Sequence, residues 1–162
     1  MKDRIKIRFA GPDDLNELTD LFVLFKEYFR ALDGKDKIKP PIAAYKAQIK
    51  SLNFSTKPIL RTLVAEQGGR LVGAISFSKG WNCDFGTHYD LPYFFIQKEF
   101  RGSRAALLFF AAIKKLAKKE KIASLVFSVY GPNKSAAKLY EHIGAKYWAD
   151  KDEHFMYLKL GG

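Results

Sequence analysis

Residues 94–106, which read FFIQKEFRGSRAA, indicate the fold more clearly than any other stretch of the chain. The apolar start at 94–96 is typical of a buried strand, and the small residues from Gly102 to Ala106 are typical of a tight turn. Apolar side chains then recur at helical spacing through residues 104–119, and residues 123–129 are again apolar. This succession of strand, helix and strand predicts a right-handed crossover between two locally parallel strands.

The same criteria divide the rest of the chain into strands and helices. Besides residues 123–129, strand patterns are expected at residues 4–9, 59–66, 71–78, 93–96 (the strand that contains 94–96), 147–148 and 155–160. Helical patterns are expected at residues 12–29, 42–52 and 132–144. Residues 67–70 indicate a hairpin turn, whereas residues 79–90 read as a loop. The order βααβββαβαββ predicts an α/β fold whose mixed, mostly antiparallel sheet is flanked by helices, in a single domain spanning residues 1–162.

Length and composition limit the number of folded cores and the kinds of site expected in the chain. A chain of 162 residues with 48% hydrophobic residues suffices for one folded core. Cys83 is the only cysteine and the three histidines show no ligand spacing, so neither an internal disulfide nor a metal site is expected. The first residues alternate charged and apolar side chains, and no later run is long enough to span a membrane. A cytoplasmic location is therefore expected.

The net charge of +11 raises the question of an anionic partner. Its densest group lies on and just after the helix at 104–119 and consists of Lys114, Lys115, Lys118, Lys119 and Lys121. One interpretation is a solvated helix face, favoured by the helix dipole. The alternative is a nucleic-acid-associated or regulatory module in which these lysines contact phosphates. No groove-recognition motif accompanies the lysines, which disfavours nucleic acid as the partner.

The turn before the helix at 104–119 also carries a chemical signal. Backbone N–H groups and the positive end of a helix dipole suit a pyrophosphate, and small residues let phosphates approach. The residues concerned are Arg101, Gly102, Ser103, Arg104, Ala105 and Ala106. An ordinary strand-to-helix turn would also explain this segment taken alone. A second segment, residues 133–145, reads NKSAAKLYEHIGA and follows the next predicted strand.

Together the two segments resemble the GNAT superfamily of acetyl-CoA-dependent N-acetyltransferases. The matching patterns are Arg-Gly-x-x-x-Ala before one helix and Asn-x-x-Ala-x-x-Leu-Tyr-x-x-x-Gly in the next. The resemblance is specific over residues 91–147 and extends to residues 1–60 only in element order. It implies that an acetyl group passes from acetyl-CoA to a primary amine of a small molecule or a protein by direct attack. Many members of the family pair, which implies a homodimer.

The resemblance also assigns individual residues. It implies that main-chain groups of Phe95 and Ile96 bind the pantetheine arm and polarise the thioester carbonyl, where the strand splays at a bulge. Asn133 would face the pantetheine arm, and Tyr140 would protonate the departing thiolate. Arg104 stands where the family pattern has glycine. Either its guanidinium pairs with a phosphate or the loop bends differently.

On the acceptor side of the site, the sequence does not single out one general base. Candidates for the general base are Asp84, His88, Tyr89, Asp90 and Tyr130, with His88 and Asp90 favoured.

The strand at 91–96 is similar to that of diamine and polyamine acetyltransferases, but Pro92 and Tyr93 stand where those enzymes have an acidic pair. A protein of charge +11 would also repel a polycation at long range. A polyamine acceptor is therefore disfavoured.

Overall fold

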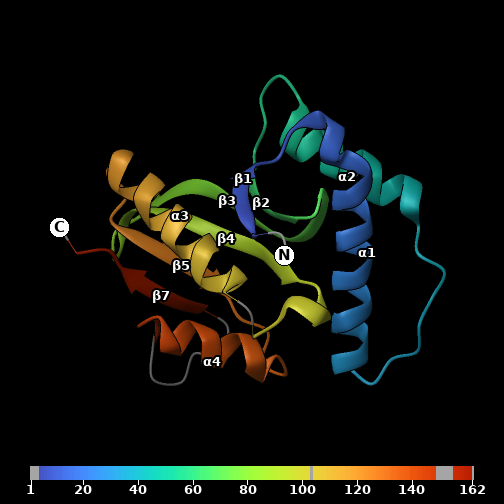
Figure 1. The fold of residues 1–162 in the computed structure, drawn as a ribbon. Helices are drawn as coiled ribbons and strands as arrows, with labels where there is room; N and C mark the ends of the chain where they lie inside the picture. The colour runs from blue at the N-terminus through green and yellow to red at the C-terminus, as the bar shows by residue number, and fades with distance from the viewer. Residues whose placement is uncertain (1–3, 103, 149–154, 162) are drawn as a thin grey trace. The chain divides into compact units, whose positions relative to one another are not determined.

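The structure, a computed structural model, describes residues 4–102, 104–148 and 155–161 (Figure 1). Its helices are α1 (Leu15–Leu32), α2 (Ile42–Phe54), α3 (Ala105–Lys119) and α4 (Lys134–His142). Its strands are β1 (Lys6–Phe9), β2 (Arg61–Gln67), β3 (Arg70–Asn82), β4 (Gly86–Ile96), β5 (Ser124–Ser128), β6 (Lys146–Tyr147) and β7 (Phe155–Lys159). Short 3-10 turns lie at Pro12–Asp14 and Lys98–Phe100. The element order confirms the predicted βααβββαβαββ succession.

Within the described residues the strands form one sheet, in the order β1-β2-β3-β4-β5-β7-β6. Strands β4 and β5 are parallel, with His88 opposite Ser124 and Leu91 opposite Phe127. The pairs β1–β2, β5–β7 and β6–β7 are antiparallel. The parallel pair confirms the prediction that the two strands joined through α3 are locally parallel. The mixed, mostly antiparallel α/β fold is therefore confirmed.

The prediction of a loop at residues 79–90 is wrong. Strand β3 continues to Asn82 and β4 begins at Gly86, so only a short turn separates them. The Asn82 Oδ1 accepts the N–H groups of Asp84 and Phe85 at 3.0 and 2.8 Å, which closes the turn. Because turn-forming residues crowd the tip, they concealed the strand alternation on either side of it.

The described residues divide into two compact units, and β3, β4 and α3 each contribute to both. The first unit holds the residues up to Ser76 together with Tyr93–Ala112. The second holds Phe77–Pro92 and the residues from Ile113 onward. The expectation of a single domain stays a prediction. None of the helices in the described ranges is both long and apolar enough to cross a bilayer.

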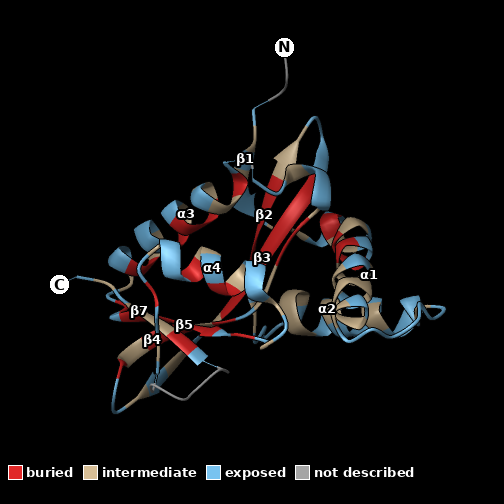
Figure 2. Cartoon of the chain, turned by 90° about the horizontal axis from the view of Figure 1, so that it is seen from below, coloured by how far each residue is buried: buried red, intermediate tan, exposed pale blue. Residues whose placement is uncertain are grey.

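In the first unit, α1 buries Leu18 and Leu21 against Val64 of β2 and Ala74 of β3. Aromatic rings from α1, α2 and β4 pack beside this core, namely Phe22, Phe25, Tyr28, Phe29, Tyr45, Tyr93 and Phe95. By contrast, α2 has no buried residue and shows no red in Figure 2. Partly buried side chains of α2, among them Ile49 and Phe54, pack against this core.

In the second unit, β5 forms the centre of the core. Its residues from Ser124 to Phe127 are all buried. The Phe127 ring stacks on Tyr140 of α4 with a centroid distance of 4.4 Å, and Phe85 stacks on Tyr157 of β7 at 4.6 Å. These ring contacts fix α4 against β5 and fix β7 against the turn before β4.

Candidate active site

Strand β4 loses its parallel partner before it ends. Its register with β5 runs from His88 to Leu91, and the strand then continues through Pro92 to Ile96. Because proline has no N–H to donate to the next rung, Pro92 gives the end of this pairing a local cause. One edge of the last residues of β4 is thereby released from the sheet.

The faces of β4 show that the strand also contains a bulge. On β3, Gly73 and Phe77 point to the same face, since their separation is even. Gly73 lies against Ile96, and Phe77 packs on Tyr89 at a ring distance of 4.8 Å. Tyr89 and Ile96 therefore share a face although their separation is odd, which a regular strand does not allow. An extra residue between them, as in a β-bulge, accounts for this geometry.

At the end of β4, main-chain groups alternate between the side of β3 and the open edge. The N–H of Gln97 donates to the Val72 carbonyl of β3 at 2.9 Å, so Gln97 faces β3. By alternation Phe95 also faces β3, whereas Phe94 and Ile96 face the open edge. We therefore expect ligand-binding main-chain groups on Phe94 and Ile96 rather than on Phe95.

Gly73 determines how closely β3 approaches the end of β4. A Cβ atom at this position would lie 2.9 Å from the Phe95 carbonyl oxygen and 3.2 Å from Ile96 Cγ1. The first of these neighbours is backbone, so it cannot rotate away. Gly73 is not among the residues expected at the site, although a lone glycine within a strand pattern is a signal of close backbone approach.

Arg101 is folded back onto the end of β4. Its Nε donates to the Ile96 carbonyl at 2.9 Å. Its guanidinium lies 4.6 Å from the centre of the Tyr28 ring and 5.3 Å from that of Phe95. A hydrogen bond and two cation–π contacts together fix Ile96 in orientation, so Arg101 is a positioning residue for this strand end.

The predicted pyrophosphate turn lies between Arg101 and α3. Gly102 has a φ of 75°, and a Cβ on it would meet no atom of the described residues beyond its chain neighbours within 4 Å, so this side of its backbone is approachable. Arg104 is exposed immediately before α3, Ala105 is buried and Ala106 is half-buried. Ser103 lies outside the described residues. The turn thus combines positive charge with the N-terminal N–H groups of a 15-residue helix.

Asn133 and Tyr140 belong to the second unit, on and just before α4. The Asn133 Oδ1 accepts the Ala136 N–H at 3.3 Å and caps the helix. Tyr140 is only 5% exposed and lies against Phe127. Burial raises the pKa of the Tyr140 phenol, which keeps its hydroxyl protonated at neutral pH.

His88 and Asp90 form a close pair on β4. The His88 Nε2 lies 3.3 Å from Asp90 Oδ2, and the Nδ1 lies 3.1 Å from the Gly86 carbonyl oxygen. Gly80 makes room for the pair, because a Cβ there would lie 2.8 Å from the Nε2. Both ring nitrogens of His88 thus lie close to oxygen atoms of β4.

The other candidates for the general base are no better placed. Tyr89 is fully buried and donates to Glu120 Oε2 at 2.6 Å, so its hydroxyl is committed to that carboxylate. Asp84 is exposed at the tip of the β3–β4 turn, and Tyr130 is exposed after β5. The general base stays open.

Part of the predicted lysine cluster surrounds a hollow in the second unit. Lys114, Lys118, Lys121 and Lys159 line a volume of about 620 Å³ at the end of α3. No acidic side chain is among the described residues that line it. The hollow is therefore a positively charged surface, which an anion would favour.

Comparison with known proteins decides what these elements belong to. Residues 18–145 match the model of the Acetyltransferase (GNAT) family. The chain belongs to the GNAT acetyltransferase family. It is thus an acyltransferase whose cofactor is acetyl-CoA. A search of curated proteins finds no significant match to the sequence.

Solved structures share the fold of this GNAT chain at low sequence identity. An acetyltransferase from Thermus thermophilus is 21% identical with a TM-score of 0.75, covering 99% of this chain and 100% of that chain. The PaiA N-acetyltransferase from Thermoplasma acidophilum, solved with coenzyme A, is 17% identical with a TM-score of 0.72, covering 96% and 99%. A ribosomal-protein-alanine N-acetyltransferase from Brucella melitensis biovar Abortus 2308 is 18% identical with a TM-score of 0.73, covering 92% and 98%.

The turn before α3 fits the cofactor of the GNAT family. Coenzyme A carries a pyrophosphate, and Arg104 brings positive charge to the residue before α3. The open side of Gly102 leaves the backbone accessible to phosphate oxygens. None of the described residues from Arg101 to Ala106 is acidic, so no described side chain of the turn would repel the pyrophosphate.

Proposed function

We propose that this chain transfers the acetyl group of acetyl-CoA to a primary amine of a small molecule or a protein by direct attack, with Tyr140 as the general acid. The observation that carries the proposal is Tyr140 itself, which occupies the tyrosine position of the motif and is buried on α4 against Phe127. Acetyl-CoA, when bound, supplies the activated acetyl group.

A buried phenol suits the role of acid. Because burial raises the pKa of Tyr140, its Oη keeps the proton until negative charge develops on a neighbouring sulfur. A free thiol has a pKa of about 8.5, but the low-water surroundings that disfavour a phenolate disfavour a thiolate as well. Donation from Tyr140 Oη therefore accompanies bond cleavage instead of preceding it.

Other groups of the chain are proposed to bind and orient acetyl-CoA. The N–H of Ile96, with Phe94 beside it, is proposed to polarise the thioester carbonyl, while Arg101 keeps Ile96 in place. The backbone of the turn through Gly102, Ser103, Arg104, Ala105 and Ala106 is proposed to hold the pyrophosphate. The Asn133 amide nitrogen is proposed to contact the pantetheine arm.

Amine acceptors other than polyamines fit best. Pro92 and Tyr93 offer no carboxylate to a polycation, and the net charge of +11 opposes its approach. One structural neighbour is by name a ribosomal-protein-alanine N-acetyltransferase, which supports a protein amine as one acceptor class. An uncharged or anionic small molecule that carries an amine is the other.

Acetyl-CoA should stabilise the folded chain. At 100 times its Kd a ligand adds about 2.7 kcal/mol, which for a chain of this size raises the Tm by about 5 to 10 °C. Differential scanning calorimetry with acetyl-CoA, and with adenosine as a control lacking the pyrophosphate, measures the shift. An unchanged Tm at saturating acetyl-CoA would contradict the proposed cofactor site.

Gly73→Ala should impair acetyl transfer. The added Cβ displaces the Phe95 carbonyl and with it the main chain of Ile96, at a strain cost of about 1–3 kcal/mol. We expect kcat/KM to fall about 10-fold or more, because 1.4 kcal/mol corresponds to a factor of about ten. Gly11→Ala is the matched control, since a Cβ at Gly11 would have no neighbour within 4 Å in the described part of the chain. Equal activity in the two variants would remove Gly73 from the supporting structure of the site.

Mass spectrometry tests the proposed reaction. The protein is incubated with acetyl-CoA labelled in the acetyl group, a mixture of primary amines and a peptide with a free N-terminus. Transfer is expected to add one labelled acetyl group to at least one amine, and boiled protein serves as the control. An unlabelled mixture after prolonged incubation would contradict the proposal.

The lysine-lined hollow supports a second candidate, a nucleic-acid-associated or regulatory role that retains the GNAT fold. Lys114, Lys118, Lys121 and Lys159 could neutralise phosphates there. A gel shift with duplex and single-stranded DNA at two salt concentrations tests it. Salt-sensitive binding without any acetyl transfer would favour this candidate over the enzyme.

A further inference from the structure

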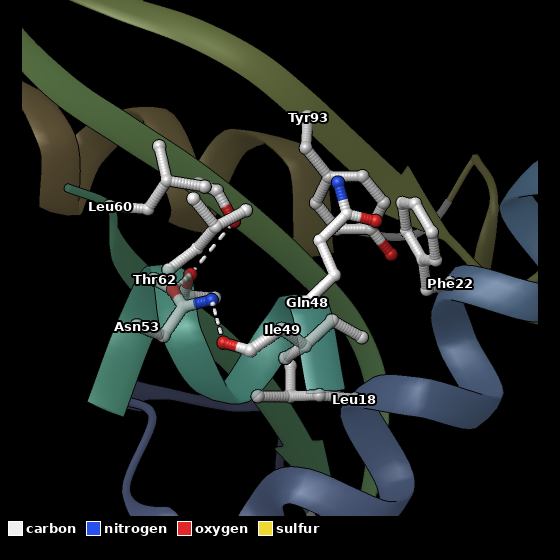
Figure 3. A pocket seen from close by; sticks show the side chains of 10 residues that line it. Leu18, Phe22, Gln48, Ile49, Asn53, Leu60, Thr62 and Tyr93 are labelled. Atoms are coloured by element: carbon white, nitrogen blue, oxygen red, sulfur yellow. Dashed lines mark hydrogen bonds between the residues drawn. The ribbon is translucent and has the colours of Figure 1, made fainter. Parts of the chain in front are cut away.

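A small cavity lies beside α2 in the first unit, as Figure 3 shows, and its volume is about 90 Å³. Apolar walls come from Leu18 of α1, Ile49 and Leu52 of α2, and Leu60 before β2. A cavity of about 150 Å³ can hold benzene. This smaller space therefore suits a short, branched aliphatic group.

The polar floor of the cavity is already hydrogen-bonded. Ser76 Oγ and Thr62 Oγ1 are 2.7 Å apart, and Thr62 donates to Asn53 Oδ1 at 2.6 Å. Since Thr62 has one hydroxyl proton, Ser76 is the donor of the first bond. Asn53 in turn donates to the Ile49 carbonyl at 2.9 Å. This chain of bonds joins α2 to β2 and β3. The polar groups of the floor therefore do not require a hydrogen bond from a ligand.

Tyr93 on β4 differs from the floor. Its hydroxyl is buried and has no hydrogen-bond partner among the residues that the structure describes. In Figure 3 the side chains of Tyr93 and Gln48 extend toward one another at the wall of the cavity. A buried hydroxyl without a partner is unfavourable, and a ligand that supplies one hydrogen-bonding atom would satisfy it.

The charge of the cavity lining limits which ligands can bind. None of the described residues that line the cavity carries a formal charge. An ammonium or a carboxylate placed there would be desolvated without an ionic partner, which is costly. Neutral ligands are therefore favoured.

We propose that this cavity binds the uncharged, branched aliphatic end of the acceptor, with one hydrogen bond to Tyr93 Oη. The inference rests on the proposed acetyl transfer and names the chemistry of the acceptor at the end away from its reacting amine. Tyr93 belongs to the same strand end as Phe94 and Ile96, so an acceptor seated on it lies along the strand that serves the thioester. Entry is feasible because the outer wall is α2, which buries no residue, and because Gln48 at the wall is exposed.

Binding is tested on the full chain without acetyl-CoA, using three probes of similar shape: isobutyramide, isobutyrate and isobutylamine. Isobutyramide is expected to shift the NMR signals of the Ile49 and Leu52 methyl groups saturably, and the two charged probes are not. Tyr93→Phe should weaken isobutyramide binding about 2- to 10-fold, as for one lost hydrogen bond. Tyr45→Phe is the matched control, because the Tyr45 ring also packs on Phe22 but does not line the cavity.

A kinetic arm ties the cavity to the acceptor. Isobutyramide should inhibit acetylation competitively against the amine and not against acetyl-CoA, and Leu52→Phe, which adds volume to the wall, should abolish both binding and inhibition. Any of three results would overturn the inference. The charged probes could bind as well as isobutyramide, Tyr93→Phe could bind isobutyramide as tightly as the parent, or isobutyramide could compete with acetyl-CoA. The NMR arm needs no turnover, so a failed cavity and a failed acetyltransferase give different results.

Discussion

Tyr140→Phe is expected to lower kcat by about 10²-fold or more, because the variant retains the ring and loses the proton donor. The ring contact with Phe127 should keep α4 in place, so the Kd for acetyl-CoA and the Tm should change little. Stopped-time acetylation assays at saturating amine, together with calorimetric titration of acetyl-CoA, separate the two effects.

Tyr157→Phe is the matched control for this variant. Its ring also stacks on a phenylalanine, Phe85, at 4.6 Å, but Tyr157 lies on β7 outside the motif. We expect its kcat to match that of the parent. If Tyr140→Phe turned over as fast as Tyr157→Phe, another group would have to supply the proton.

The direction of the Tyr140 shift also predicts the pH profile. Burial raises the pKa of Tyr140, so its acidic form persists above the pH at which a free tyrosine, with a pKa of about 10, ionises. No alkaline loss of rate due to Tyr140 should therefore occur below about pH 9. A descending limb centred near pH ~8 that vanished in Tyr140→Phe would contradict this assignment.

Arg104→Ala is expected to weaken acetyl-CoA binding by about 1.5 to 3 kcal/mol, the range for a hydrogen bond to a charged group. Arg104 is exposed directly before α3, where a positive charge opposes the helix dipole unless an anion is present. A phosphate contact would give the residue its reason for standing where the family pattern has glycine. Calorimetric titration at low and high salt measures the loss, which should shrink as salt screens the pair.

The matched control for Arg104→Ala is Lys98→Ala, which removes an exposed cation from the 3-10 turn before Arg101. Its effect on affinity should stay small. Should Arg104→Ala bind acetyl-CoA as tightly as the parent at both salt levels, with a slightly higher Tm, Arg104 would belong to the solvated surface instead.

The element order could be predicted because each element carries its own local signal. The hairpin at residues 67–70 is an example, since Gly68 and Gly69 adopt φ angles of 58° and 74° that other residues avoid. The longer extent of β3 and β4 could not be predicted. Their ends near Asn82 and Gly86 are rich in turn-forming residues, and strand pairing across the turn decides their state.

Candidate site residues could be named from the sequence where they act by side-chain type. Motif spacing alone suggests Tyr140 and the turn after Arg101, and their roles stay predictions. The direction of main-chain groups at Phe94, Phe95 and Ile96 was not predictable, because it depends on the register with β3 and on a bulge that no single residue encodes. The role of Gly73 is a cross-strand contact and equally needs the register.

The side-chain partners of candidate residues were also beyond the sequence. His88 and Asp90 read as bases, yet each ring nitrogen of His88 lies against an oxygen acceptor. Arg101 reads as a phosphate ligand, yet its Nε binds the Ile96 carbonyl. In both cases a neighbour close in sequence, brought near by the geometry of the strand or turn, competes for the group.

The central claim, acetyl-CoA-dependent acetylation of an amine, is tested most directly by continuous detection of free thiol. The purified protein is mixed with acetyl-CoA and a panel of primary amines that includes neutral branched amines, polyamines and peptide N-termini. We expect thiol release only when acetyl-CoA and an amine are both present. At least one amine other than the polyamines should give a higher rate of release than the polyamines do. The rate should fall about 10²-fold in Tyr140→Phe. Thiol release that is absent with every amine, or equal in the parent and Tyr140→Phe, would contradict it.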